Sequence, residues 1–232
     1  MAKQAANPSI ERELRTPRAA AIAGILFAAL YSTSWILIRL STPQEANMVG
    51  ESLPQQPGGL SLAMSLVPFS GIAFLWFMGV VRDRMGQQED QFFSTLFFGS
   101  GFLYLSMSFA SAAVLGGTLA LLAADSSLLQ GGASYALGVA ISSRLNSVYA
   151  TRMAGALMVA LGTIWVRTRV MPRWLALATY VVAAVLLTSI GFTVWVVLLF
   201  PAWVAAISAA VLVLNYREVS EGEEPDIPSG GQ

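Results

Sequence analysis

The stretch FFSTLFFGSGFLYLSMSFASAAVLGGTLALLAA, residues 92–124, contains no Asp, Glu, Lys or Arg. An apolar helix crosses the hydrocarbon core of a bilayer, ~30 Å thick, with about 20 residues. This stretch is therefore long enough for a complete crossing, and about a dozen apolar residues are left over. We read it as the third membrane-spanning helix of the chain.

Other apolar runs have the length of a span and lie at 19–40, 62–81 and 147–166, the last with apolar character reaching back toward 134. The segment 174–214 is about twice as long as one span, so we expect two helices with a break near Gly191. The chain is thus predicted to be all-α: a polytopic membrane helical bundle with six transmembrane helices.

The composition agrees with a membrane protein. Of the 232 residues, 56% are hydrophobic and 11% are charged, against about 25% charged residues in an ordinary soluble domain. The formal net charge is zero, which gives no electrostatic footprint for nucleic acid. Because the chain has neither Cys nor His, thiolate and imidazole metal sites are excluded, and we expect no metal and no cofactor.

The basic residues predict the orientation. Ten of them fall on one side of the predicted spans: Lys3, Arg12, Arg15, Arg18, Arg82, Arg84, Arg167, Arg169, Arg173 and Arg217. The positive-inside rule makes this side cytoplasmic, so both termini are expected there. We divide the chain into a basic cytoplasmic N-terminus (1–18), a six-helix transmembrane domain (19–216) and a disordered acidic cytoplasmic tail (217–232). Arginine strongly outnumbers lysine, which favours a GC-rich bacterium and hence a multi-pass protein of its cytoplasmic (inner) membrane.

All thirteen carboxylates lie outside the predicted hydrocarbon depth. Ion-coupled carriers usually keep a titratable group inside the membrane, because a proton relay needs one. Their absence argues against coupled transport, and no residue is predicted to be catalytic.

Three arginines gather toward the outer side: Arg39, Arg144 and Arg152. Arg152 lies well within a span, so it either snorkels toward the outer headgroups or faces the bundle interior and holds an anion or a lipid phosphate. Arg144 precedes it by two helical turns, and Arg39 ends the first helix at a similar height. Together they predict either one basic mouth that binds an anion or lipid headgroup, or three separate interface anchors.

Helices three and four are predicted to be overlong. The stretch 134–150 has apolar residues at helical spacing, Leu137, Ile141, Leu145 and Val148, with polar residues on another face. We expect an antiparallel helical hairpin at the outer surface, with its turn at 130–132. Strong tilt, or a re-entrant stretch kinked at 116–117, is the alternative. An apolar face on such a hairpin favours a homo-oligomer or a partner membrane subunit.

Smaller features complete the candidate sites. On helix three, Tyr104, Ser108 and Ser111 share a face and either line a polar pocket or bond to a neighbouring helix. Two prolines are expected to kink helices, Pro68 and Pro201. The short inner loop has alternating charges and is either a salt-bridged turn or a docking point for a cytoplasmic partner: Arg82, Asp83, Arg84, Glu89 and Asp90.

The segments WFMGVVRDRMG, EDQFFSTLFFGSGFLY and RVMPRWLA together resemble bacterial six-helix integral membrane proteins of uncharacterised activity. The resemblance covers most of the chain. It implies the six-helix fold and supplies no activity or catalytic residue.

Three functions remain open. The first is a non-enzymatic membrane protein, a channel or transporter, that binds or passes a small solute, anion or lipid through a cavity near the outer leaflet. The second is an accessory or scaffold subunit that acts through helix packing. The third is a lipid-modifying enzyme, which would need acid–base residues near the interface, where only Asp125 and the outer arginines are available.

Overall fold

The computed structural model describes residues 8–41, 58–85, 91–124, 133–168, 171–189 and 194–221. Within these ranges the regular structure is entirely helical, and no strand occurs. The elements in chain order are α1 (Pro8–Ser41), α2 (Gly58–Met85), α3 (Gln91–Ala124), α4 (Ala133–Arg144), the π-helix η3 (Leu145–Ala150), α5 (Thr151–Thr168), α6 (Arg173–Thr188), the 3-10 helix η4 (Val194–Leu198) and α7 (Leu199–Glu221).

Five helical stretches are long and apolar enough to cross a membrane: Ala21–Ser41, Gly59–Arg82, Gln91–Leu121, Ala133–Thr168 and Trp195–Val213. The shorter α6 is also apolar. The predicted all-α class is confirmed over the described residues, and five helices of this length and composition indicate a multi-pass membrane protein. The double-length segment 174–214 is indeed divided, because α6 ends at Thr188 and η4 begins at Val194; Gly191 itself lies outside the described residues.

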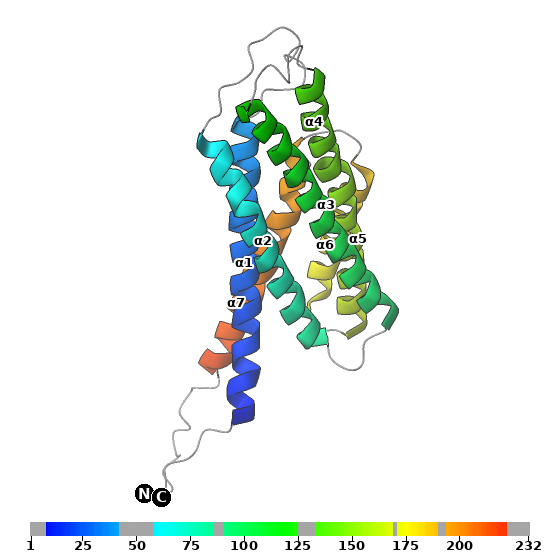
Figure 1. Ribbon diagram of the computed structural model, residues 1–232. Coiled ribbons are helices and arrows are strands. Elements are labelled where there is room, and N and C mark those ends of the chain that lie inside the picture. The colour runs from blue at the N-terminus through cyan, green and yellow to red at the C-terminus, as the bar shows by residue number, and fades with distance from the viewer. Residues whose placement is uncertain are drawn as a thin grey trace, which may run out of the picture.

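The bundle is built around α1 and α5. Helix α1 packs against α2 on one side and α7 on another, while α5 packs against α3 and α6. The first turns of α1 and the last turns of α7 lie at the same end of the molecule (Figure 1). An aromatic cluster joins the two groups of helices at the centre, where Phe27, Phe74, Tyr104 and Phe200 contact one another with ring centroids 4.8–6.4 Å apart.

Several helix ends differ from the sequence prediction. Helix α1 begins at Pro8, so it includes most of the segment assigned to a separate N-terminus. Helix α7 continues to Glu221, which makes 217–221 helical where a disordered tail was predicted. Residues 222–232 of that tail lie outside the described residues. Both helices extend beyond their apolar spans into polar sequence. Extension is possible because each added residue of a helix gains a backbone hydrogen bond, whatever its side chain.

Helices α3 and α4 pack against each other, and the helical run Ala133–Thr168 is continuous through η3. The predicted turn of this pair, 130–132, lies outside the described residues. On α4 the large apolar residues of the face noted in the sequence point away from the bundle. Leu137 and Ile141 are exposed, at 61% and 43%, while Gly138 and Ser142 are buried. The reason is that lipid is itself apolar, so small and polar residues occupy helix contacts while large apolar ones face outward.

The two prolines have different settings. Pro68 lies inside α2. Pro201 is the third residue of α7, directly after η4. It therefore lies in the first turn of α7, and because η4 and α7 are contiguous it is also inside the helical stretch Trp195–Val213.

Candidate functional site

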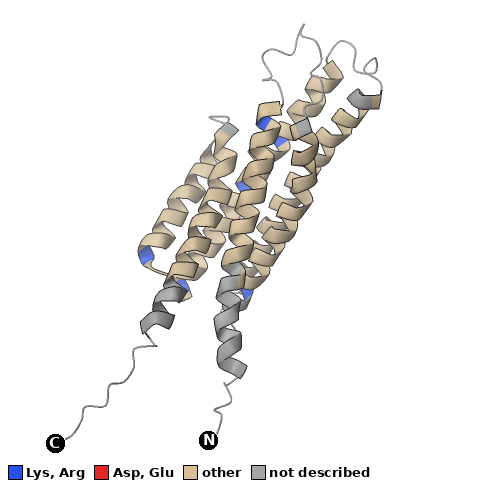
Figure 2. Cartoon of the chain, turned by 90° about the vertical axis from the view of Figure 1, so that its left-hand side faces the viewer, with Lys and Arg blue, Asp and Glu red and all other residues tan. Residues whose placement is uncertain are grey.

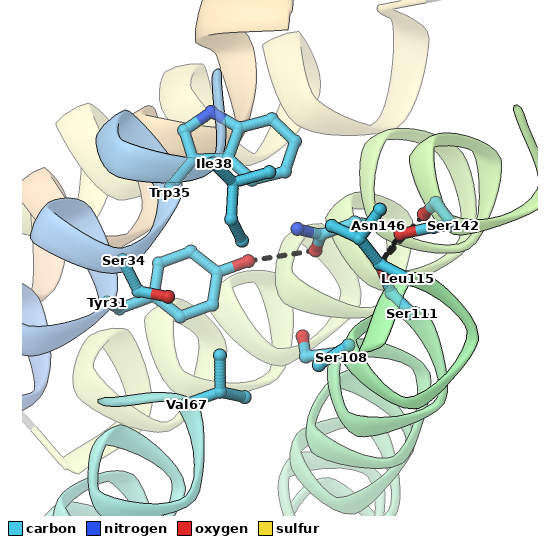
Figure 3. Close-up of a pocket in the computed structure, with 11 residues that line it drawn as sticks. Tyr31, Ser34, Trp35, Ile38, Val67, Ser108, Ser111, Leu115, Ser142 and Asn146 are labelled. Atoms are coloured by element: carbon cyan, nitrogen blue, oxygen red, sulfur yellow. Dashed lines mark hydrogen bonds between the residues drawn. The ribbon is translucent and has the colours of Figure 1, made fainter. Parts of the chain in front are cut away.

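A small cavity of about 30 Å³ lies between α1, α2, α3, α4 and η3. By the usual allowance for a buried water, this is space for about two water molecules. Figure 3 shows polar side chains from α1 facing polar side chains from α3, α4 and η3 across it. The lining residues are Tyr31, Ser34, Trp35, Ile38, Val67, Ser108, Ser111, Ala112, Leu115, Ser142 and Asn146.

Hydrogen bonds between helices frame the cavity. The hydroxyl of Tyr31 donates to Oδ1 of Asn146 at 2.8 Å, and both side chains are buried. On the far wall, Ser111 donates to the carbonyl oxygen of Ser142 at 2.8 Å, and the two hydroxyls are 3.0 Å apart. These contacts fix α1 and α3 to the α4–η3 segment, because in a dry environment each polar group must find a partner.

Other polar groups at the cavity are unpaired. The Oγ atom of Ser108 and the indole nitrogen of Trp35 are buried and have no hydrogen-bond partner among the described residues. The hydroxyl of Tyr104, one turn before Ser108 on α3, is in the same state. In Figure 3 the hydroxyl of Ser108 points toward the space between Tyr31 and Asn146. A buried polar group left unpaired costs about 1–3 kcal/mol. Ser108 and Trp35, which both line the cavity, are therefore the groups whose burial a bound polar molecule would offset most.

The backbone that carries Asn146 is unusual. Asn146 belongs to the π-helix η3, whose register is held by a hydrogen bond from the Thr151 hydroxyl to the Asn146 carbonyl oxygen at 3.0 Å. A π-helix closes i→i+5 hydrogen bonds and is frequent at functional sites. Here it places a carboxamide group opposite Tyr31 in the middle of a membrane helix.

The cavity is polar but uncharged. None of the side chains that the structure describes is Asp or Glu, and Figure 2 shows basic but no acidic residues on the described helices. The same part of the chain holds no group of three or more His, Cys, Asp or Glu side chains that could bind a metal ion. The lining groups are hydroxyls and a carboxamide, which donate and accept hydrogen bonds, and an indole N–H, which only donates. Such a set matches a small neutral molecule with both donors and acceptors.

No protein-family model, curated protein or solved structure matches this chain. The chemistry of the cavity therefore carries the functional argument.

The three outer arginines do not line the cavity. Arg152 is half-buried and donates from Nη1 to the carbonyl oxygen of Val148 in its own helix, at 3.1 Å. Arg144 is exposed, and Arg39 is half-buried near the end of α1. The spacing of two helical turns between Arg144 and Arg152 applies to a continuous α-helix, and the π-helix η3 lies between the two residues and changes the helical register.

On α3, Ser108 and Ser111 line the cavity, whereas Tyr104, one turn before Ser108, is buried but is not among the lining residues. Sequence reasoning missed the opposite wall on α1, formed by Tyr31, Ser34 and Trp35, and it also missed Asn146 on η3 as a cavity residue. A signal for them existed. Tyr31, Ser34 and Ile38 recur at helical spacing, and Asn146 is an amide inside a predicted span.

At the opposite end of the bundle, the guanidinium of Arg82 lies over the ring of Phe98, 5.2 Å from its centroid. This contact joins the end of α2 to the start of α3 by a cation–π interaction. Asp83 and Arg84 belong to α2, but their side chains, like the residues Glu89 and Asp90, lie outside the described part of the chain. The docking function predicted for this loop stays a prediction.

Proposed function

We propose that this chain is a non-enzymatic, six-span protein of a bacterial inner membrane that binds or passes a small neutral solute. Its site is the cavity between Tyr31, Ser108 and Asn146. The observation that supports this proposal is the set of buried polar groups at the cavity that have no hydrogen-bond partner among the described residues, chiefly the hydroxyl of Ser108. A solute that supplies hydrogen bonds there removes their desolvation cost.

The cavity belongs to the outer half of the membrane in this proposal. Its α1 residues, Tyr31 to Ile38, occupy the C-terminal half of the span Ala21–Ser41. With both termini cytoplasmic, as the distribution of basic residues indicates, the C-terminal end of this first span faces outward.

The neutral character of the solute follows from the lining. Bringing an anion into an apolar medium is very costly unless a charge is paired with it. Among the described residues no arginine reaches the cavity wall. Water, or an uncharged alcohol or amide of similar size, suits this lining better than the anion or lipid headgroup that the outer arginines suggest.

The test is solute entry into liposomes that contain the purified protein. The external concentration of glycerol, urea or salt is raised in one step, and light scattering follows the volume of the liposomes. Their shrinkage reports the exit of water, and their later swelling reports the entry of the solute. Ser108→Leu fills the cavity, and because the Ser108 hydroxyl has no hydrogen-bond partner among the described residues, the substitution breaks no bond within them. We expect it to slow entry of water or the neutral solute about tenfold. Ser106→Leu is the matched control, because Ser106 is exposed on the same helix.

The same assay separates the neutral solute from an anion. Arg152→Met is expected to leave entry of the neutral solute unchanged, because Arg152 bonds to its own helix and not to the cavity. Chloride entry that is lost in Arg152→Met, with no effect of Ser108→Leu on any neutral solute, would overturn the proposal in favour of an anion site.

A second candidate, an accessory subunit or homo-oligomer, is favoured by the length of α3. Its 34 residues span about 51 Å, against a hydrocarbon core of ~30 Å. If the α3–α4 pair projects as an outer hairpin, Leu121 and Leu137, which are 51% and 61% exposed, meet water at its tip. A second copy or a partner membrane subunit would cover them.

A further inference from the structure

The buried residues of α4 and α5 form two series that differ by one residue. On α4 they recur every three or four positions and lead to η3: Tyr135, Val139, Ser142 and Asn146. Followed backward from the middle of α5, the buried residues are Leu161, Leu157, Ala154 and Ala150, and a further step of three residues reaches Ser147, which is half-buried with a buried hydroxyl. The extra residue between the series is accommodated by η3, because a π-helix takes one more residue per hydrogen-bonded ring.

Two adjacent polar residues, Asn146 and Ser147, can therefore occupy the position opposite Tyr31, one in each helical register. Asn146 ends the α4 series and pairs with Tyr31. Ser147 begins the α5 series, and its hydroxyl is buried with no hydrogen-bond partner among the described residues. Both flanking series are anchored, α4 by the bond between Ser142 and Ser111 and α5 by its fully buried side chains. Between these two anchored faces lies the π-turn, whose present register carries the hydrogen bond from the Thr151 hydroxyl to the Asn146 carbonyl oxygen.

We infer that η3 is a movable register defect that exchanges Asn146 for Ser147 opposite Tyr31. Shifting the π-turn toward the N-terminus extends the α5 register through Ser147 and turns Asn146 away. The exchange replaces a carboxamide with a smaller hydroxyl, so the cavity widens beside Tyr31. The inference rests on the proposed function in treating this cavity as the solute site, and it adds the device that opens and closes it.

Single-residue deletions lock each register. Deleting Ser147 leaves a continuous α-helix with Asn146 opposite Tyr31, whereas deleting Leu145 leaves one with Ser147 in that place. Both deletions keep the α4 and α5 faces in phase, so we expect both proteins to remain folded. Deleting Val159 is the control. This residue lies within α5, where a deletion rotates one half of the helix relative to the other and exposes part of its buried face to lipid. The midpoint of thermal unfolding should therefore fall.

The register is read directly from the side-chain amide signal of Asn146. Protein labelled with ¹⁵N-asparagine is placed in lipid nanodiscs, and the signal is assigned by its loss in Asn146→Ser. The two deletion variants give the Asn146 chemical shifts of the two registers. We expect the unmodified chain to give either two Asn146 signals at these shifts or one exchange-averaged signal between them. A single Asn146 signal that coincides with that of the Ser147 deletion at every temperature overturns the inference.

If a deletion variant does not fold, the number of Asn146 signals from the unmodified chain still tests the register exchange. A single sharp Asn146 signal that does not broaden on cooling then overturns the inference. Solute entry is measured separately on the same proteins. Faster entry after deletion of Leu145 than after deletion of Ser147 supports both the register exchange and the solute site. Two Asn146 signals with no protein-dependent entry of any solute leave the exchange standing and overturn the proposed function.

Discussion

At the scale of single residues, the interior of this bundle is defined by polar groups in an apolar setting. Tyr31 and Asn146 are separated by 115 positions in sequence and meet at 2.8 Å. A second long-range contact of the same kind joins Trp203 to Thr179, where the indole N–H donates to the hydroxyl at 3.0 Å. Such bonds select helix partners, because lipid offers polar side chains no alternative partner.

Tyr31→Phe tests the bond to Asn146. The substitution removes one hydroxyl and leaves the buried carboxamide oxygen without its donor, so we expect the free energy of unfolding to fall by about 1 kcal/mol. Titration with a denaturing detergent in mixed micelles measures it. Tyr149→Phe, at a side chain that is 57% exposed, serves as the control. An equal effect of the two substitutions would show that the bond adds no stability.

At the scale of helical elements, close approach depends on small residues at particular heights. A Cβ atom added at Gly138 on α4 would overlap the side chain of Thr118 on α3, whereas one added at Gly117 meets no atom of the described residues within 4 Å. The α3–α4 contact is therefore set by Gly138. Spacing alone, as in the small residues at 108, 112 and 116, does not identify which small residue carries a contact.

Gly138→Ala should be destabilising although alanine is the better helix former. The added methyl group forces α3 and α4 apart, at a cost of about 1–3 kcal/mol, which exceeds the gain of about 1 kcal/mol in helix propensity. Thermal unfolding in detergent measures the change. Gly117→Ala, where space is open, is expected to be neutral or slightly stabilising. The cost should shrink in a Thr118→Ala background; an unchanged cost there would assign the effect to some other contact.

At the scale of the whole molecule, topology is the open property that experiment can settle most directly. The chain has no natural cysteine, so single cysteines can be placed without removing any. In intact cells, a membrane-impermeant thiol reagent should label Glu51→Cys at once and Ser220→Cys only after permeabilisation. Labelling in the reverse order would invert the proposed orientation. Disulfide-linked dimers of Leu137→Cys, absent for the equally exposed Leu177→Cys, would favour the oligomer candidate.

By itself the sequence determined the class of the molecule and the limits of its chemistry. Long apolar runs specify membrane helices locally, since burial in lipid depends only on the composition of each segment, and the segment 174–214 was divided correctly for that reason. On α3, the shared face of Tyr104, Ser108 and Ser111 was also visible from periodicity.

Only the tertiary structure decided which residues meet. It brought Tyr31 to Asn146, buried Ser142 against Ser111, and placed the outer arginines away from the cavity wall. The physical reason is twofold. In lipid, hydrophobicity does not distinguish the inside of the bundle from its surface, so helix partners are selected by shape and hydrogen bonds. In addition, the one-residue offset at η3 breaks the periodicity on which a sequence argument along Ala133–Thr168 depends.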